Sequence, residues 1–342
     1  MRRRLVELVR VGLVGAGRIG AMHAETIARR LPGVVLAGVA DPVGEAAERV
    51  AAPYGVRATT DVEGLMGDPE VDAVAITSVA AAHSQLVVAA ARAGKAVFCE
   101  KPMALSLEDA DRAIGAAREA GVALQVGFNR RFAKDFAAVH EVVVAGGIGT
   151  PQLMRSVTRD PGWPAGLKNP GGVRPWTIFL ETLIHDFDTL LWLNPGAKPL
   201  EVFTRADALV APEFKEQGLL DTAVVTITFD NGAIATAEAN FSALYGYDVR
   251  GEVFGSKGML SAGNLLQSAM VHHHADGVSL RTVRSDVEMF IDAYTAEMAA
   301  FVNAVREKST PVVTGEDARN ALAIALAAIA SYQSSQPEKV AE

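Results

Sequence analysis

The residues with the clearest capacity for chemistry are an acid, an imidazole and an ammonium group. Glu181 and His185 stand four positions apart in an apolar segment, so an α-helix would place them one above the other. The carboxylate could then orient or charge-stabilise the imidazole, which titrates near neutral pH and suits a general base. A surface Glu–His pair or a buried structural histidine fits the same spacing. Lys101 precedes Pro102, and it is either a solvated turn residue or a cation that faces a ligand.

A second chemical pattern is the glycine-rich turn from Gly15 to Gly20, with the sequence GAGRIG. Gly15 permits a tight turn, Gly17 lets backbone N–H groups approach a pyrophosphate, and Gly20 allows the following helix to pack closely on the strand. The N-terminus of that helix carries partial positive charge, which attracts phosphate. A strand precedes the turn, and Asp41 ends a second strand about 20 residues later, which is the spacing of a dinucleotide site.

Asp41 bears on the choice of dinucleotide. Its carboxylate can accept hydrogen bonds from the adenosine ribose hydroxyls and repels a 2′-phosphate, so NAD is favoured over NADP. Arg18 could soften this exclusion, which leaves NADP as the weaker alternative. A glycine turn without a ligand is the remaining interpretation.

Alternating strands and helices position these groups. Apolar runs and helical periodicity predict strands over 10–14, 34–40, 71–77, 96–99 and 122–126, and helices over 22–30, 82–93 and 107–120. Repeated units of this kind form a parallel, doubly wound sheet, in which ligands lie beyond the C-terminal ends of the strands. Gly15, Asp41, Thr77 and Lys101 all fall at that edge, so we expect Lys101 to face the cofactor.

The pattern changes after about Gly127. A hairpin signal at Asp230-Asn231-Gly232 and alternating or apolar runs predict an antiparallel sheet, with strands over 224–229, 233–239, 247–253 and 258–261. The segment 160–175 is rich in Pro, Gly and Trp, and we expect an ordered loop over a site. At about 150 residues per domain, 342 residues allow two domains. We place them at residues 1–127 and 128–342.

Composition narrows the partners and the location. With a net charge of −8, we expect no nucleic-acid partner and no polybasic membrane patch. No apolar run approaches the roughly 18 residues of a membrane span. The basic start Met1–Arg4 is not expected to begin a targeting signal, because the charged residues Glu7 and Arg10 interrupt the apolar stretch after it. The single cysteine, Cys99, is expected in the core; it excludes an intrachain disulfide and fits a cytoplasmic location.

The remaining histidines are weaker candidates. His272 to His274 make a poor metal site because adjacent side chains point in different directions, so we expect a solvated loop and no metal. His23 in the first helix and His83 near Thr77 could lie near the cofactor or pack at helix starts.

Three motifs together carry a family resemblance: the GAGRIG turn, Glu100-Lys101-Pro102, and ETLIHD from Glu181 to Asp186. The chain resembles the Gfo/Idh/MocA oxidoreductases, and within them the inositol 2-dehydrogenase branch, over about residues 11–330. GFNRRF from Gly127, YGYD from Tyr245 and SKG from Ser256 are similar to that branch as well. The resemblance implies an α/β fold: an N-terminal Rossmann domain with a doubly wound parallel sheet, and a C-terminal α/β domain with a large, mostly antiparallel open sheet that often mediates tetramers.

The resemblance also implies a chemistry. It predicts NAD-dependent oxidation of a secondary hydroxyl of a cyclic polyol or sugar, such as myo- or scyllo-inositol, to the ketone. Lys101 and His185 match the catalytic lysine and histidine of the family, and Glu181 replaces the usual Asp. Trp176 and Thr177 stand where many relatives carry two glycines. Trp176 could narrow the pocket or stack on an apolar sugar face.

These considerations define the expected sites and partners. The expected cofactor contacts are Gly15, Gly17, Arg18, Ile19, Gly20, Asp41, Thr77, His83, Glu100 and Lys101. The expected substrate contacts are Asn129, Arg130, Asp160, Trp176, Thr182 and Tyr247. The partners are a small polyol or sugar and, in a homotetramer, other copies of the chain. The alternatives are an aldose dehydrogenase of the same family, a glycoside hydrolase that recycles NAD, and a non-catalytic NAD-binding sensor.

Overall fold

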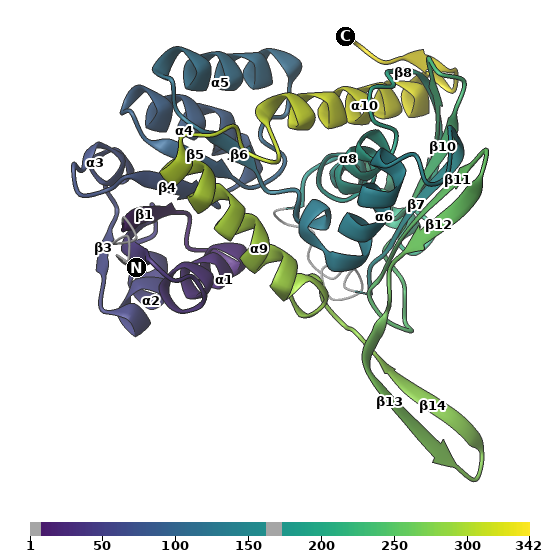
Figure 1. Cartoon of the computed structure of the whole chain (residues 1–342), viewed down its shortest axis with the longest axis horizontal. Coiled ribbons are helices and arrows are strands. Elements are labelled where there is room, and N and C mark those ends of the chain that lie inside the picture. The colour runs from purple at the N-terminus through teal and green to yellow at the C-terminus, as the bar shows by residue number, and fades with distance from the viewer. Residues whose placement is uncertain (1–7, 162–172) are drawn as a thin grey trace. The chain divides into compact units, whose positions relative to one another are not determined.

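The computed structural model describes residues 8–161 and 173–342, and the chain forms two compact units (Figure 1). The first unit comprises Met1–Asn129 and Asp292–Arg319, and the second comprises Arg130–Ile291 and Asn320–Glu342. The expected domain limits, 1–127 and 128–342, stay a prediction. The structure adds that residues 292–319 pack with the first unit.

A parallel sheet is the centre of the first unit, as expected, but it has six strands, and the short strand Arg57–Thr59 was not predicted. Its strand order is β3-β2-β1-β4-β5-β6, and every neighbouring pair is parallel. The order reverses between β1 and β4, which is where sheets of this kind bind ligands. The strands are β1 Val9–Val14, β2 Val34–Ala40, β3 Arg57–Thr59, β4 Ala73–Ile76, β5 Ala96–Cys99 and β6 Leu124–Val126.

Helices connect these strands, and α5 shows how the sequence sets their ends. Ser106 Oγ accepts a hydrogen bond from the Asp109 N–H at the start of α5, and Gly121 ends the helix in the left-handed region, at φ 64°. The helix expected over 22–30 begins earlier, at Arg18, and its second half is π-helical. The segments are α1 Arg18–Glu25, η1 Thr26–Arg30, α2 Gly44–Ala51, η2 Ala52–Tyr54, α3 Val62–Gly67, α4 Ala80–Arg92 and α5 Leu107–Ala120.

A helix from late in the chain completes the core of the first unit. This helix, α9, spans Asp286–Glu307, and its residues from Asp292 onward belong to the first unit. Met298, Phe301 and Val302 of α9 are buried in the same apolar cluster as Leu13 and Phe98 of the central strands. The hydrophobic periodicity of the sequence did not predict that a helix so late in the chain packs into the core of the first unit, because periodicity reports only local structure.

The second unit is built on a seven-stranded, mostly antiparallel sheet, as expected. Its order is β12-β11-β7-β10-β9-β8-β15, and only the pair β7 and β10 is parallel among these neighbours. Strands β7, β8 and β15 were not predicted from the sequence. The strands are β7 Pro151–Arg159, β8 Pro199–Asp207, β9 Thr222–Phe229, β10 Ile234–Asn240, β11 Asp248–Gly255, β12 Gly258–Ala262 and β15 Glu338–Lys339.

One face of this sheet is covered by helices. The segments η4 and α8 contact β10, and α8 also contacts β7. Along β9 the inward side chains Val225, Ile227 and Phe229 are buried and alternate with more exposed residues, as one-sided burial requires. The helical segments of this part of the chain are η3 Asn129–Phe132, α6 Lys134–Val144, η4 Ile178–Leu183, α8 Ile184–Trp192, η5 Pro212–Gln217 and α10 Gly315–Ser334.

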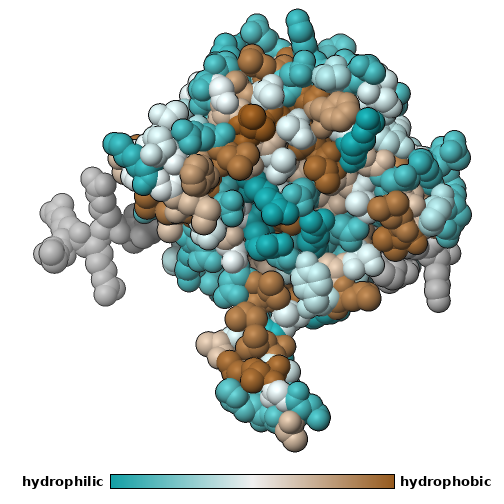
Figure 2. Space-filling model, turned by 90° about the vertical axis from the view of Figure 1, so that its right-hand side faces the viewer, coloured by the Kyte–Doolittle hydropathy of each residue, from teal (hydrophilic) through white to brown (hydrophobic). Residues whose placement is uncertain are grey.

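A two-stranded hairpin of β13 (Leu266–His274) and β14 (Gly277–Thr282) extends from the second unit. Its residues are almost all exposed, and apolar atoms gather on it at the bottom of Figure 2. The expectation of a loop at His272–His274 was wrong, because these residues pair with Gly277–Ser279 as a strand. Their expected exposure is confirmed.

Two observations on the described residues bear on the expectations from composition. Cys99 is fully buried at the end of β5, as expected, and burial raises the pKa of its thiol well above the ordinary value. Within residues 8–161 and 173–342, no helix is both long enough and apolar enough to cross a bilayer.

Candidate functional site

A cavity of about 640 Å³ lies where the central strands of the first unit end. The glycine turn after β1, Asp41 after β2 and Thr77 after β4 all line it. The structure thus brings together three of the four residues that the sequence placed at this edge, while Lys101, the fourth, is not among the lining residues. Such a volume falls in the range of small-molecule and cofactor sites.

Close packing fixes the glycine turn. Gly15 has φ +101°, a conformation that other residues rarely adopt, and a Cβ at Gly20 would collide with the carbonyl oxygen of Gly15. Thr77 Oγ1 donates to that same carbonyl oxygen at 2.7 Å, so Thr77 holds the turn. Around Gly17, by contrast, a Cβ would meet nothing within 4 Å. This open space in front of the backbone fits the approach of a pyrophosphate.

Asp41 is held in a fixed orientation at the rim of the cavity. Its two carboxylate oxygens accept hydrogen bonds from the Ala16 N–H at 2.7 Å and the Val43 N–H at 2.8 Å. A carboxylate offers about four acceptor sites, so capacity remains for ribose hydroxyls. Glu63 also lines the cavity, and none of the described lining residues is Lys or Arg. The lining therefore fits NAD and offers no cation for a 2′-phosphate.

The other expected cofactor residues have different surroundings. Arg18 is exposed and Ile19 is half-buried at the start of α1. His83 is buried, and its two ring nitrogens lie 2.8 Å from the Pro102 carbonyl oxygen and 2.9 Å from that of Ser78. His83 thereby ties the turn after β5 to the end of β4.

The turn after β5 carries Glu100 and Lys101. Glu100 is buried, and its Oε1 lies 2.8 Å from His23 Nε2, while its Oε2 accepts the Lys101 N–H at 3.2 Å. Burial alone raises the pKa of this carboxyl. The hydrogen bond with His23 and the charges of His23 and Lys101 outweigh burial, so the pKa lies below the ordinary value. Glu100 is therefore ionised and holds the main chain of Lys101 by this hydrogen bond. The Lys101 residue is half-buried.

In the second unit, His185 lies at the start of α8 and is half-buried. Glu181 lies on Ile178–Leu183, which is π-helical and not α-helical as the sequence predicted, so its backbone hydrogen bonds run from i to i+5. The pairing of Glu181 with His185 stays a prediction. Thr182 lies on the same π-helical segment and is half-buried.

A buried network anchors the residue next to His185. Asp186 is fully buried and accepts hydrogen bonds from Arg130 Nη1 at 2.8 Å, Ser156 Oγ at 2.5 Å and Thr158 Oγ1 at 2.7 Å. Arg130 is itself only 2% exposed, so its guanidinium is committed to this network. Removal of one partner of such a buried charge pair strongly destabilises the folded protein, because the other charge stays buried without compensation. Asp186 therefore fixes the position of α8 on β7.

Sequence reasoning missed the supporting aspartates. Asp188 is buried as well and accepts hydrogen bonds from Arg131 Nε at 3.0 Å and Nη2 at 2.5 Å. The sequence did contain a signal for these ion pairs. Two aspartates stand close to His185, one next to it and one three residues after it, and the basic pair Arg130-Arg131 stands earlier in the chain. Charged residues in an apolar helix are rarely buried unless they are paired.

The remaining expected substrate contacts are dispersed among several elements. Asn129 is 3% exposed, and Asp160 is half-buried directly after β7. Tyr247 precedes β11, and burial raises the pKa of its phenol. Trp176 has φ +66°, and its ring lies edge-on to that of Tyr332, with centroids 5.8 Å apart. Most of the loop expected over 160–175 falls at 162–172, outside the described residues.

Comparison with known protein families assigns the chain to a class of oxidoreductases. Residues 9–128 match the model of an oxidoreductase family with an NAD-binding Rossmann fold, and residues 158–341 match its C-terminal alpha/beta domain. These matches cover most of the chain, so the protein belongs to the Gfo/Idh/MocA oxidoreductase family. It is an NAD-dependent oxidoreductase, as the motifs predicted.

Individual relatives narrow the comparison. The chain is 38% identical to a myo-inositol 2-dehydrogenase of Thermotoga maritima over 98% of this chain and 99% of the relative. It is 35% identical to an NAD⁺-dependent scyllo-inositol 2-dehydrogenase of Bacillus subtilis over 96% and 95%. A crystal structure of a scyllo-inositol dehydrogenase from Lactobacillus casei, with bound NAD(H) and scyllo-inositol, superimposes with a TM-score of 0.93 at 28% identity, covering 98% of this chain and 100% of that chain.

Proposed function

We propose that the protein oxidises a secondary hydroxyl of a cyclic polyol of the inositol type to the ketone, with NAD as the hydride acceptor. The observation that carries this proposal is the similarity of nearly the whole chain to enzymes named inositol 2-dehydrogenases. The NAD-type cavity and the anchored His185 segment supply the matching parts in this chain.

In this proposal His185 takes the proton of the reacting hydroxyl. Its backbone is held by the neighbouring Asp186, which is tied to Arg130 and Thr158. Glu181 orients the imidazole or stabilises its charged form, and Lys101 donates a hydrogen bond to the developing alkoxide. When bound, NAD supplies the acceptor for the hydride that leaves the same carbon. The turn that carries Lys101 is fixed by Glu100 and His83.

The cofactor and substrate contacts extend this assignment. We assign the pyrophosphate to the turn from Gly15 to Gly20 and the adenosine ribose to Asp41, with Thr77 holding the turn. We assign the other hydroxyls of the polyol to Asn129, Asp160, Thr182 and Tyr247, and one face of the ring to Trp176. A site lined by several hydrogen-bonding groups discriminates stereoisomers, because a missing hydroxyl leaves a buried group unpaired.

The assembly is proposed to be a homotetramer in the cytoplasm. Leu153, Ile234 and Phe254 are about half exposed and adjacent across strands β10, β7 and β11, which gives the sheet an apolar outer patch. Exposed patches of this kind commonly mark contacts between protein chains. The buried single cysteine and the absence of any second cysteine are compatible with a reducing compartment.

A substrate panel tests the proposed function directly. Purified protein is incubated with NAD or NADP and with myo-inositol, scyllo-inositol and several aldoses, while absorbance of the reduced cofactor is followed. We expect NADH to accumulate with an inositol and much less product with NADP. Turnover of aldoses but of no inositol would identify the protein as a sugar dehydrogenase instead. Cleavage of a glycoside without net NADH would instead indicate a hydrolase.

A further inference from the structure

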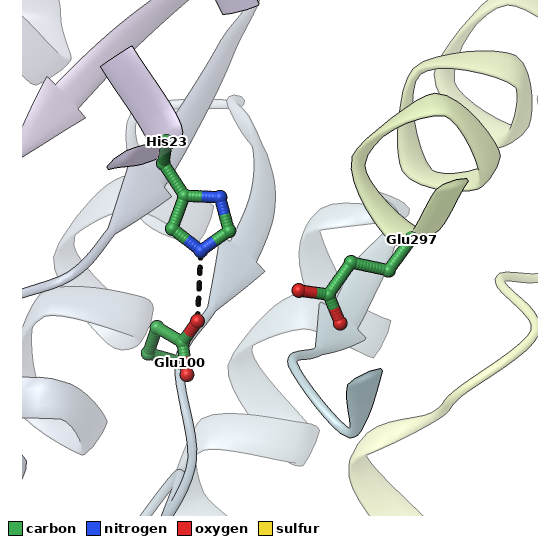
Figure 3. A group of neighbouring side chains, drawn as sticks. All are labelled: His23, Glu100 and Glu297. Atoms are coloured by element: carbon green, nitrogen blue, oxygen red, sulfur yellow. Dashed lines mark hydrogen bonds and ion pairs between the residues drawn. The ribbon is translucent and has the colours of Figure 1, made fainter. Parts of the chain in front are cut away.

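Three ionisable side chains meet in the interior of the first unit. His23 of α1, Glu100 after β5 and Glu297 of α9 each offer a polar atom, and these atoms all lie within 4.8 Å of one another (Figure 3). His23 and Glu297 are 0% exposed and Glu100 is 7% exposed. None of the three is among the residues that line the NAD cavity. The proposed chemistry uses Glu100 only as an anchor and does not use Glu297.

Glu100 accounts for one negative charge in this cluster. Its Oε1 lies 2.8 Å from His23 Nε2, and its Oε2 accepts the Lys101 N–H. The rings of Phe98 and Tyr294 lie edge-on to His23, at centroid distances of 5.1 and 5.8 Å, so two aromatic rings pack against the imidazole of this buried cluster. A charge without a partner is costly in such surroundings.

Glu297 has no such partner. Its carboxyl group points from α9 toward Glu100 in Figure 3, and neither of its oxygens has a hydrogen-bond partner among the described residues. The nearby Gln125 side chain donates to the main-chain carbonyl of Glu297, at 2.7 Å, and not to its carboxyl group. Burial first and the charge of Glu100 second raise the pKa of Glu297 well above the ordinary value.

We propose that Glu297 is a positioning residue, held as a neutral carboxylic acid whose O–H faces the Glu100 carboxylate and steadies the turn that carries Lys101. The inference rests on the proposed function for the role of Lys101. The titratable groups that face Glu297 are His23 from α1 and Glu100 after β5, while Lys101 and His83 act on Glu100 through their charges. A neutral acid adds a donor without adding a second negative charge.

A bound divalent cation is the competing explanation for the same three groups. It would require an ionised Glu297 and a His23 nitrogen released from Glu100. The hydrogen bond already present between His23 and Glu100, and the two aromatic rings packed against His23, favour the neutral acid. Metal analysis of the purified protein distinguishes the two: one bound metal per chain that is lost in Glu297→Gln would overturn the proposal.

The pH dependence of stability tests the proton on Glu297 without any assay of activity. A carboxyl group with a raised pKa in the folded state makes the protein less stable as the pH rises above the pKa of the unfolded chain. Glu297→Gln mimics the neutral acid with an amide that does not ionise, so it removes the pH dependence of stability that Glu297 contributes. Between about pH 5 and 8, the unfolding equilibrium constant of the unsubstituted protein should rise by up to about tenfold per pH unit relative to that of the variant. A ratio that stays constant with pH would overturn the proposal.

Turnover tests the positioning role. Glu297→Gln keeps a donor toward Glu100, whereas Glu297→Leu removes it at similar size. We expect the kcat of Glu297→Gln to stay within about threefold and that of Glu297→Leu to fall by about tenfold or more, with NAD affinity retained in both. Equal losses in both variants would exclude a donor role. If the unsubstituted protein oxidises no polyol, the proposed function fails, while the stability comparison still decides the state of Glu297.

Discussion

Lys101 and His185 are the side chains that touch the reacting hydroxyl in the proposed chemistry, so they should be the most sensitive to removal. We predict that Lys101→Ala and His185→Ala each lower kcat by about 10²-fold to 10⁴-fold, because each removes a proton-transfer or charge-stabilising group. NAD affinity should change little. Turnover followed by NADH absorbance and a cofactor titration measure the two quantities.

A matched control limits the interpretation of these losses. Lys339 is exposed on β15, and Lys339→Ala should leave turnover unchanged. Near-normal rates in Lys101→Ala or His185→Ala would remove that residue from the mechanism.

Asp41 should govern the choice between the two dinucleotides. Asp41→Ala removes both the ribose acceptor and the charge that repels a 2′-phosphate, so NAD affinity should fall by about tenfold to a hundredfold while NADP affinity falls less or rises. Asp41→Asn removes the charge but keeps one acceptor oxygen, which can serve either the Ala16 or the Val43 N–H group, so it should show a smaller loss than Asp41→Ala. An unchanged NAD-to-NADP ratio in both variants contradicts the role of Asp41.

At the scale of elements, local signals predicted regular segments and missed irregular ones. The helix 107–120 and the strand 96–99 have the expected bounds, because a Ser cap, a terminal glycine and a short apolar run define them locally. The strand β7 was missed because its burial does not alternate strictly. The π-helical segment Ile178–Leu183 was missed because its hydrogen bonding has no sequence signature as clear as a cap.

The residues of the candidate site also fall into those that local sequence patterns could predict and those that they could not. The Gly15 turn and Asp41 could be predicted, because both belong to one strand–turn–helix–strand unit. Asp186 and Glu297 could not, because their partners stand far away along the chain and only the folded packing brings them together.

Trp176, at the entry to the π-helical segment, stores backbone strain. Its φ of +66° is unfavourable for a residue with a Cβ, by about 1–2 kcal/mol. Trp176→Ala and Trp176→Gly both lose the contact with Tyr332, but only glycine relieves the strain. We therefore predict that Trp176→Gly is more stable than Trp176→Ala by about 1 kcal/mol, as measured by denaturant unfolding. Equal stability of the two variants would show that the backbone relaxes without glycine.

At the scale of the whole molecule, the NAD-binding unit depends on a segment far along the chain. Phe301 of α9 is fully buried against the core that holds Phe98. We predict that Phe301→Ala destabilises the protein by about 3–5 kcal/mol, because it removes apolar burial and leaves a cavity. Thermal unfolding with and without NAD measures this loss. The exposed Val312→Ala is the matched control, and a similar small effect in both would contradict the role of Phe301.

The discontinuous first unit has a consequence for biosynthesis. Its parallel sheet emerges from the ribosome early, but Met298, Phe301 and Val302, which close its core, follow only after residues 130–291 have been made. At about 5–20 residues per second, the nascent sheet waits on the order of ten seconds or more for its last helix. During that interval we expect its apolar surface to be exposed to chaperones, and a fragment that ends near Gly127 lacks the α9 side chains that complete its core.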